Sequence, residues 1–247
     1  MITNPKVKNM KYLNLLKTSA VLLLVIAVNN TNVLAQSSKN VSVKAFNEVT
    51  VSSGLDLYLT QTTNEALTIK GQEDLIKDVV VEQNGSSLVI KYKDGIKWGS
   101  LFKNQSIKVY LNYKNLKSLT ASGGSDVYTQ NNLKADVLNL RASGGADLKL
   151  TLTVKDLNLT ISGGSDAELK GSGENLIATA SGGSDMDAFG YVVNNARVIA
   201  SGGSDANIYV NKALEAGASG GSDVNYKGSA VLKKTSSSKS GDVNHVN

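Results

Sequence analysis

The sequence predicts an all-β protein whose single chain winds into a β-solenoid, a right-handed parallel β-helix with an irregular β-cap at its N-terminal end. Three observations lead to this prediction. A five-residue motif recurs at a nearly constant spacing, the residues before each motif alternate between apolar and polar, and the chain has 23 glycines but one proline. Proline removes a donor from a β-ladder, whereas glycine permits the sharp corners that a solenoid needs.

The repeated motif is Ser-Gly-Gly-Ser-Asp, which occurs six times, once with alanine in place of the second serine. Its aspartates are spaced 21, 19, 19, 20 and 18 residues apart, and a degenerate copy contains Asp242. An isolated relative, Ser52-Ser53-Gly54-Leu55-Asp56, lies far upstream. Paired glycines permit the positive φ angles of a tight turn, so each motif is expected to form one corner of a coil. The six aspartates are Asp126, Asp147, Asp166, Asp185, Asp205 and Asp223.

The residues before each corner alternate with a period of two. In one repeat Leu157, Leu159 and Ile161 are apolar, while Asn158 and Thr160 between them are polar. This pattern is typical of a strand with one buried face. Stacked coils about 4.8 Å apart would align such residues into continuous interior rows. Right-handed connections are the norm between parallel strands, and a left-handed helix of hexapeptides would need three corners per coil instead of one.

The first 35 residues have the composition of a signal peptide. Four lysines accompany an apolar run over residues 18–28, and Ala35 ends a small-residue cleavage motif before Gln36. The run is shorter than the ~20 apolar residues of a spanning helix, which favours cleavage over an uncleaved anchor. We therefore expect an exported protein without a transmembrane segment, located in the periplasm, on the outer cell surface or in the medium.

Removal of this segment changes the charge balance. The chain has 26 basic and 21 acidic residues, so the loss of four lysines leaves 22 against 21, a net charge of +1. A nucleic-acid-binding protein would keep a basic surplus, so that class is excluded. The chain has no cysteine, which excludes disulfides, a thiol nucleophile and a lipid-carrying cysteine.

Residues 36–117 are less regular and are expected to form a β-cap that continues into the solenoid of residues 118–247. Asn84-Gly85 predicts a hairpin turn, and residues 73–77 predict a single helical turn. Solenoids need atypical end repeats that protect their open edges, although a separate small β-domain is an alternative. The strand-like runs are residues 41–51, 55–61, 66–70, 79–83, 88–93 and 107–113.

The export segment, the repeated corners and two early segments together resemble the bacterial head GIN domain family of putative autotransporter adhesins. The two segments are Gly54-Leu55-Asp56-Leu57-Tyr58-Leu59 and Asn84-Gly85-Ser86-Ser87-Leu88-Val89-Ile90. The resemblance covers residues 40–230. It implies a β-helix-like fold without established catalytic residues, and a role in cell-surface adhesion.

The aspartate column has two interpretations. Aspartates commonly accept hydrogen bonds from nearby backbone N–H groups, so each would cap its own turn. Alternatively, stacked carboxylates would bind Ca²⁺, which prefers oxygen ligands and would relieve their repulsion. The Ca²⁺-binding nonapeptide is met only in part, because its third glycine is missing. Capping is favoured, no cofactor is expected, and added calcium should change the melting temperature little.

A second candidate site is the least repetitive stretch of the chain. It holds Lys97, Trp98, Phe102 and Lys103, including the only tryptophan. As an exposed aromatic and basic loop it would contact an acidic glycan or a protein partner. The favoured alternative is that both aromatic side chains plug the end of the solenoid, since their burial contributes strongly to stability.

The residue inventory argues against catalysis. The only histidine, His245, lies two residues from the C-terminus, so it cannot activate one of the many serines in the repeats. A carboxylate present in every coil is better explained by the coil than by one active site. The sequence therefore predicts a non-enzymatic exported protein that binds a cell-surface or extracellular glycan or protein. The alternatives are a polysaccharide-acting enzyme with paired carboxylates and a periplasmic structural or sensory accessory protein.

Overall fold

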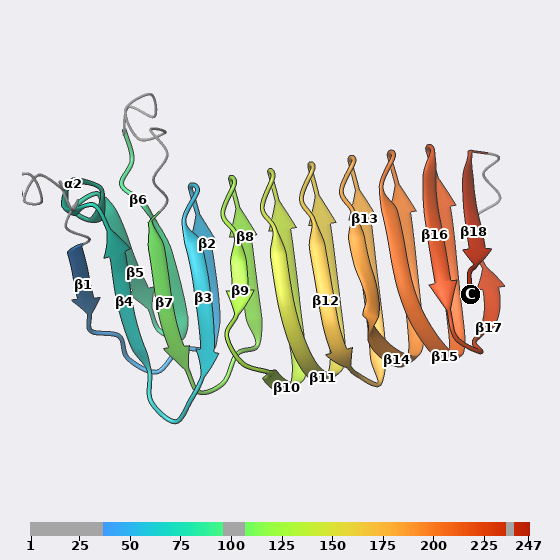
Figure 1. Ribbon diagram of the computed structural model, residues 1–247, viewed down its shortest axis with the longest axis horizontal. Coiled ribbons are helices and arrows are strands. Elements are labelled where there is room, and N and C mark those ends of the chain that lie inside the picture. Colours follow the sequence, from blue (N-terminus) through green and yellow to red (C-terminus); the bar gives the residue numbers. More distant parts are fainter. Residues whose placement is uncertain (1–36, 96–106, 236–239) are drawn as a thin grey trace, which may run out of the picture. The chain divides into compact units, whose positions relative to one another are not determined.

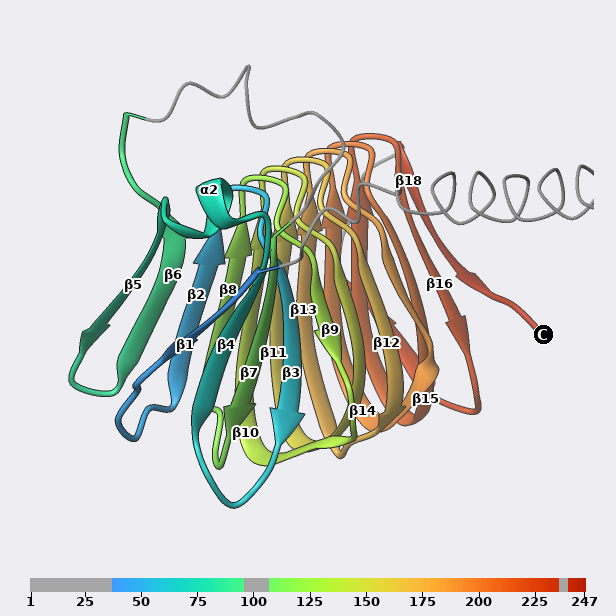
Figure 2. The ribbon, with the colours of Figure 1, turned by 60° about the vertical axis from the view of Figure 1, so that its left-hand side comes forward.

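The computed structural model describes residues 37–95, 107–235 and 240–247. Its strands form a β-solenoid of about seven turns within the compact unit Gln36–Asn247, which confirms the predicted fold class. Two sheets face each other across the interior and are joined by glycine corners at one edge and by bends at the other (Figures 1 and 2). None of the helical segments in the described ranges is long and apolar enough to cross a membrane.

We call the sheet that leads into each corner the rear sheet and the sheet that leaves it the front sheet, as they lie in Figure 1. The rear sheet contains, in spatial order, β5 (Val79–Asn84), β6 (Ser87–Tyr92), β2 (Glu48–Ser52), β8 (Ser118–Ser122), the C-terminal halves of β10 (Leu133–Ser143) and β11 (Leu148–Ser162), β13 (Asn175–Ser181), the C-terminal halves of β14 (Met186–Ser201) and β15 (Asp205–Ser219), and β17 (Val231–Lys234).

The front sheet is built from the strands that follow the corners. It contains, in spatial order, β1 (Ser37–Val41), β4 (Ala66–Gly71), β7 (Lys108–Tyr113), β3 (Asp56–Gln61), β9 (Val127–Thr129), the N-terminal half of β11, β12 (Ala167–Ser172), the N-terminal halves of β14 and β15, β16 (Ser222–Lys227) and β18 (Gly241–His245).

The chain winds with a right hand. It ascends the rear sheet, crosses at a corner and descends the front sheet while it advances toward the C-terminus (Figures 1 and 2). Successive coils pair in parallel, so that Leu159 lies opposite Leu140 on one side and Ala178 on the other. Among the described strands, the register shifts only in the front-sheet pairings of β14 and around its bend. Strands β10, β11, β14 and β15 each continue through the bend. They can do so because their hydrogen bonds run along the solenoid axis to the neighbouring coils, and these bonds can persist while the chain turns within its own coil.

The interior consists of apolar rows together with one row of serines. Leu140, Leu159 and Ala178 are each at most 2% exposed, as the alternation predicts. The second serine of the motif is also fully buried, and Ala146 takes its place in one coil. The Ser204 hydroxyl accepts the Ser201 N–H at 3.0 Å and lies 2.9 Å from the carbonyl oxygens of Ser201 and Ala180. The buried serines are Ser125, Ser165, Ser184, Ser204 and Ser222.

The N-terminal part stacks in an order that differs from its order in the chain. β2 lies between β6 and β8, and β3 lies between β7 and β9. The upstream corner at Ser53 and Gly54 is therefore a member of the stack. The side chain of Gln61 links this coil to its neighbours, because its amide donates to the carbonyl oxygens of Lys114 and Lys134 at 3.1 and 3.0 Å.

The expected hairpin and helical turn are both present, as the β5–β6 pair and α2 (Glu73–Ile76). The single strand expected over residues 41–51 is wrong, because β1 ends at Val41 and β2 begins at Glu48. Between them Phe46 is buried, and the Lys44 N–H donates to the side chain of Gln83 at 2.9 Å. These contacts hold the segment between β1 and β2 away from the edge of the front sheet, so that the chain can cross to the rear sheet.

Replacing Ser53 by glycine is expected to stabilise the protein by about 0.5–1 kcal/mol. Ser53 has a φ of 71°, whereas the equivalent position in later corners is glycine, such as Gly123 with a φ of 60°. Relief of this strain outweighs the greater flexibility of glycine in the unfolded chain. Urea unfolding measures the difference, with Ser52→Gly as the control at a position of ordinary φ. Equal effects of the two substitutions would contradict the prediction.

Candidate binding surface

The aspartate column runs along the outer face of the front sheet, next to the corners. The Oδ1 atom of Asp166 accepts the backbone N–H of Asp185 at 3.2 Å, and Asp185, Asp205 and Asp223 each repeat this contact with the following coil at 3.1–3.2 Å. Each of these carboxylates thus caps the next coil instead of its own turn. No group of three or more His, Cys, Asp or Glu side chains within the described ranges is arranged to hold a metal ion. Ca²⁺ binding by the column stays the alternative to capping.

The surroundings of Asp147, a member of the aspartate column, favour the neutral form of its carboxyl group. Partial burial raises the pKa of its carboxyl group, and the negative charge of Asp126 raises it further. A hydrogen bond from the backbone of Asp166 acts in the opposite direction. Because the shift favours the protonated form, ionised Asp147 destabilises the folded state at pH values above its folded pKa.

Replacing Asp147 by asparagine is expected to raise the melting temperature at pH 7, by no more than about 2 °C. Asparagine keeps an acceptor for the backbone of Asp166 but carries no charge. The gain should disappear as the pH falls below the ordinary aspartate pKa, because the native carboxyl is then protonated as well. Thermal scans at both pH values test this, with Asp187→Asn as a control outside the column. A gain that persists in acid would show that charge is not the cause.

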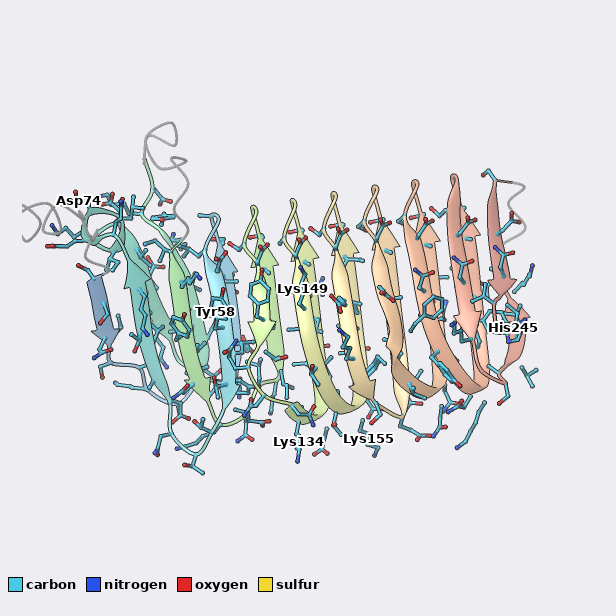
Figure 3. The ribbon with its side chains drawn as sticks, viewed as in Figure 1. Tyr58, Asp74, Lys134, Lys149, Lys155 and His245 are labelled. Carbon is cyan, nitrogen blue, oxygen red and sulfur yellow. The ribbon has the colours of Figure 1, made fainter. Side chains whose placement is uncertain are left out.

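A ladder of three stacked tyrosines lies beside the column on the same face. The Tyr58 ring is 5.0 Å from the Tyr110 ring and 5.1 Å from the Tyr128 ring, measured between centroids, with interplanar angles of 17°. All three are half-buried and point outward, because the strand neighbours of each, such as Leu57 and Leu59, face the core. Figure 3 shows Tyr58 on this face, with Lys149 farther along the same row.

Charged groups surround the ladder. The Lys70 Nζ lies 4.7 Å from the Tyr110 ring centroid, and the Lys108 Nζ lies 5.8 Å from that of Tyr58. The Tyr128 hydroxyl donates to the Oδ2 of Asp126 at 3.3 Å. Burial, followed by the charge of Asp126, raises the pKa of Tyr128 to about 12, so its hydroxyl stays a neutral donor at physiological pH.

The row that contains the tyrosines continues along the whole front sheet. Beyond the ladder it changes from aromatic to charged and then to amide side chains. The last amides bond to one another, with the Asn225 Nδ2 donating to the Asn207 Oδ1 at 3.1 Å. The row therefore offers donors and acceptors at the spacing of the coils. Its members after Tyr128 are Lys149, Glu168, Asp187, Asn207, Asn225 and Asn244.

Sequence reasoning missed the tyrosine ladder. Tyr58 and Tyr128 each follow a motif aspartate by two residues, and this shared offset was the available signal. Tyr110 follows Lys108 instead, and only the pairing of β7 with β3 brings it into the row.

The other candidate residues lie apart from the ladder. Lys97, Trp98, Phe102 and Lys103 fall outside the described residues. His245 lies at the C-terminal end of the solenoid, away from Tyr58 (Figure 3), where a ring nitrogen is 2.9 Å from the carbonyl oxygen of Gly228.

A polar groove of about 640 Å³ follows the bend edge of the solenoid. Lys134 and Lys155 line it together with Asp136 and Glu174, and Figure 3 shows both lysines at this edge. The opposite charges of the lining residues balance, so the groove carries no net preference for an anion or a cation.

A family model described as "Putative auto-transporter adhesin, head GIN domain" matches residues 45–230. No curated protein matches the chain significantly.

Solved structures share the fold. A putative adhesin from Bacteroides fragilis is 22% identical with a TM-score of 0.78, and the match covers 86% of this chain and 97% of that one. A putative adhesin from Parabacteroides merdae is 22% identical with a TM-score of 0.67, covering 86% and 96%. A protein from Parabacteroides distasonis named a putative lipid binding protein is 19% identical with a TM-score of 0.67, covering 88% and 98%.

Proposed function

Because this chain belongs to the head GIN domain family of putative auto-transporter adhesins, we propose that it is an exported, non-enzymatic adhesion protein that binds a carbohydrate through the outer face of its front sheet. Membership of an adhesin family supports export and adhesion. The choice of face and of ligand class rests on the arrangement of the side chains.

The tyrosine ladder is the observation that carries this proposal. Stacked rings such as those of Tyr58 and Tyr110 are held by strands of a rigid solenoid, so binding would order few side chains. Because the rings stack on one another, each tyrosine offers a saccharide the apolar edge of its ring and a polar tip. Asp126 and Lys108 beside the ladder, and the amides beyond it, supply donors and acceptors for hydroxyl groups.

The engagement of the carboxylates favours binding over glycoside hydrolysis. Hydrolysis by paired carboxylates needs an acid and a base in different environments. Asp166, Asp185 and Asp205 instead have the same environment, since each accepts the backbone N–H of the aspartate in the next coil. A row of equivalent carboxylates can make the same contact with successive units of an extended ligand.

Replacing Tyr58 and Tyr128 together by asparagine is expected to weaken glycan binding at least tenfold. Asparagine already occupies this row at Asn207, so the fold should accept it. Tyr209→Asn, a half-buried tyrosine outside the ladder, is the control and should bind like the parent protein. The measurement is retention of the unit Gln36–Asn247 on a glycan array, followed by titration with the retained glycan.

Two results would count against the proposal. Unchanged binding by the double variant would exclude the ladder as the contact surface. Failure of the parent protein to bind any glycan would exclude carbohydrate as the ligand, and release of reducing ends from a bound polysaccharide would favour an enzyme.

A further inference from the structure

A shallow groove crosses the outer face of the rear sheet near its C-terminal end. Its volume is about 540 Å³, and it lies between two rows of outward side chains contributed by four successive coils. One wall is Asn175, Asn195, Ala213 and Val231, and the other is Ile177, Arg197, Glu215 and Lys233.

The groove exposes apolar side chains that the fold does not require. Ile177 is 54% exposed and Val231 is 78% exposed. The neighbours of Ile177 in its row are Asn158 and Arg197, which shows that a polar side chain fits this position. Ile177 and Val231 stand at opposite ends of the groove, and an apolar surface rimmed by polar residues often marks a binding site. The small outward side chain of Ala213 keeps the space between the walls open, whereas Ala196 faces the core.

The charges of the groove lie on one wall only. Arg197 and Lys233 stand on either side of a single carboxylate, Glu215, which gives this wall a net charge of +1. The Arg197 Nε lies 3.6 Å from one Glu215 oxygen, and the Lys233 Nζ lies 4.0 Å from the other. A guanidinium has five N–H donors in a planar fork, so Arg197 can also bind a second anion. The opposite wall carries no charged side chain.

We propose that this groove binds a monomeric fatty-acid anion. The alkyl chain lies along the solenoid axis between Ile177 and Val231, and the carboxylate pairs with Arg197. Four coils about 4.8 Å apart give the groove a length of roughly 14 Å, which suits a single extended alkyl chain. One wall without a charged side chain and one wall with a net positive charge, each with an exposed aliphatic side chain, match the two parts of such a ligand. The groove lies on the opposite sheet from the tyrosine ladder. Fatty-acid binding can therefore be tested independently of carbohydrate binding.

The test is a calorimetric titration of the unit Gln36–Asn247 with octanoate, decanoate and dodecanoate below their micelle-forming concentrations. Full burial would strengthen binding about fourfold per methylene, so an open groove should give about twofold. Ile177→Asn and Ala213→Trp, which fills the groove, should each weaken dodecanoate binding at least tenfold. Arg197→Gln should weaken dodecanoate tenfold but leave neutral dodecyl maltoside unchanged.

Val137→Asn is the matched control, because Val137 is 46% exposed on the same face but lies outside the groove. It should bind dodecanoate like the parent, and circular dichroism should show that every variant is folded. Absence of dodecanoate binding, absence of a chain-length dependence, or an equal effect of Ile177→Asn and Val137→Asn would overturn the proposal. Binding of phosphatidylglycerol vesicles without binding of dodecanoate would also overturn it, in favour of a membrane surface.

Discussion

Replacing the exposed glycine Gly171 by alanine is expected to lower the free energy of unfolding by about 3–4 kcal/mol. Substitutions at exposed positions usually change stability by less than about 0.5 kcal/mol, so this effect would be unusually large. The reason lies in the close approach of two backbones. Gly171 pairs with Leu152 of the preceding coil, at the lower end of the front sheet.

Two separate features make an alanine unfavourable there. Gly171 has a φ of 116°, a conformation that residues with a Cβ rarely adopt. A Cβ atom would also lie 1.9 Å from the carbonyl oxygen of Leu152 and 2.9 Å from its carbonyl carbon. Those atoms belong to the backbone of a paired strand, so no side-chain rotation can relieve the overlap. The coils would have to separate locally, with loss of the hydrogen bonds between them.

Gly183→Ala is the matched control for this prediction. Gly183 has a φ of 75°, but a Cβ there would meet no atom within 4 Å. The free energy of unfolding of Gly183→Ala should therefore fall by only about 1–2 kcal/mol, the cost of the positive φ angle for a residue with a Cβ. Urea unfolding of both variants, followed by far-ultraviolet circular dichroism, measures the two losses. If the two variants lost equal stability, contact between coils at Gly171 would not be the cause.

Loss of the buried serine hydroxyl at a corner is expected to have the second largest effect on stability. Ser204→Ala should lower the free energy of unfolding by about 2 kcal/mol. The Ser204 hydroxyl accepts the Ser201 N–H at 3.0 Å, and alanine would remove this acceptor. A backbone donor left unpaired inside a protein carries the full loss of its hydration. Alanine fits the site, since Ala146 fills the same position in another coil with 0% exposure.

The reverse change provides the control. Ala146→Ser would supply the hydroxyl that this corner lacks, and should stabilise the protein by up to about 1 kcal/mol. Chemical unfolding of both variants gives the two values. Opposite signs would assign the effect to the hydrogen bond, whereas destabilisation by both would assign it to packing. Exchange of the Ser201 amide hydrogen should also be faster in Ser204→Ala, because the donor loses its acceptor.

The repeats could be predicted from the sequence because their signals are local. Alternation such as that from Leu157 to Ile161 determines which side chains face inward. Paired glycines such as Gly182 and Gly183 determine where the chain can turn with positive φ. A nearly constant period then favours one arrangement, in which equivalent corners of successive coils are stacked on one another. These properties belong to single coils, so they can be predicted from the sequence without knowing which coils lie next to each other.

The direction of the aspartate contacts depended on stacking. Local turn chemistry predicted that each carboxylate would cap its own corner, but Asp166 reaches the N–H of Asp185 in the next coil. The stacked coils bring that N–H within 3.2 Å, and the same geometry repeats at Asp185 and Asp205. The sequence motif identifies the aspartate carboxylate as the acceptor. Which backbone N–H donates to it depends on how closely the coils stack.

The repeat pattern was thus enough to predict the solenoid, its corners and its interior rows. The insertion of β2 and β3 between strands that follow them in the chain became apparent only in the folded protein. That insertion assembles Tyr58, Tyr110 and Tyr128 into one ladder. The physical reason is that parallel strand edges of similar pattern can pair in several orders. The choice among them depends on long-range contacts, such as those of Gln61 with Lys114 and Lys134, which leave no periodic trace in the sequence.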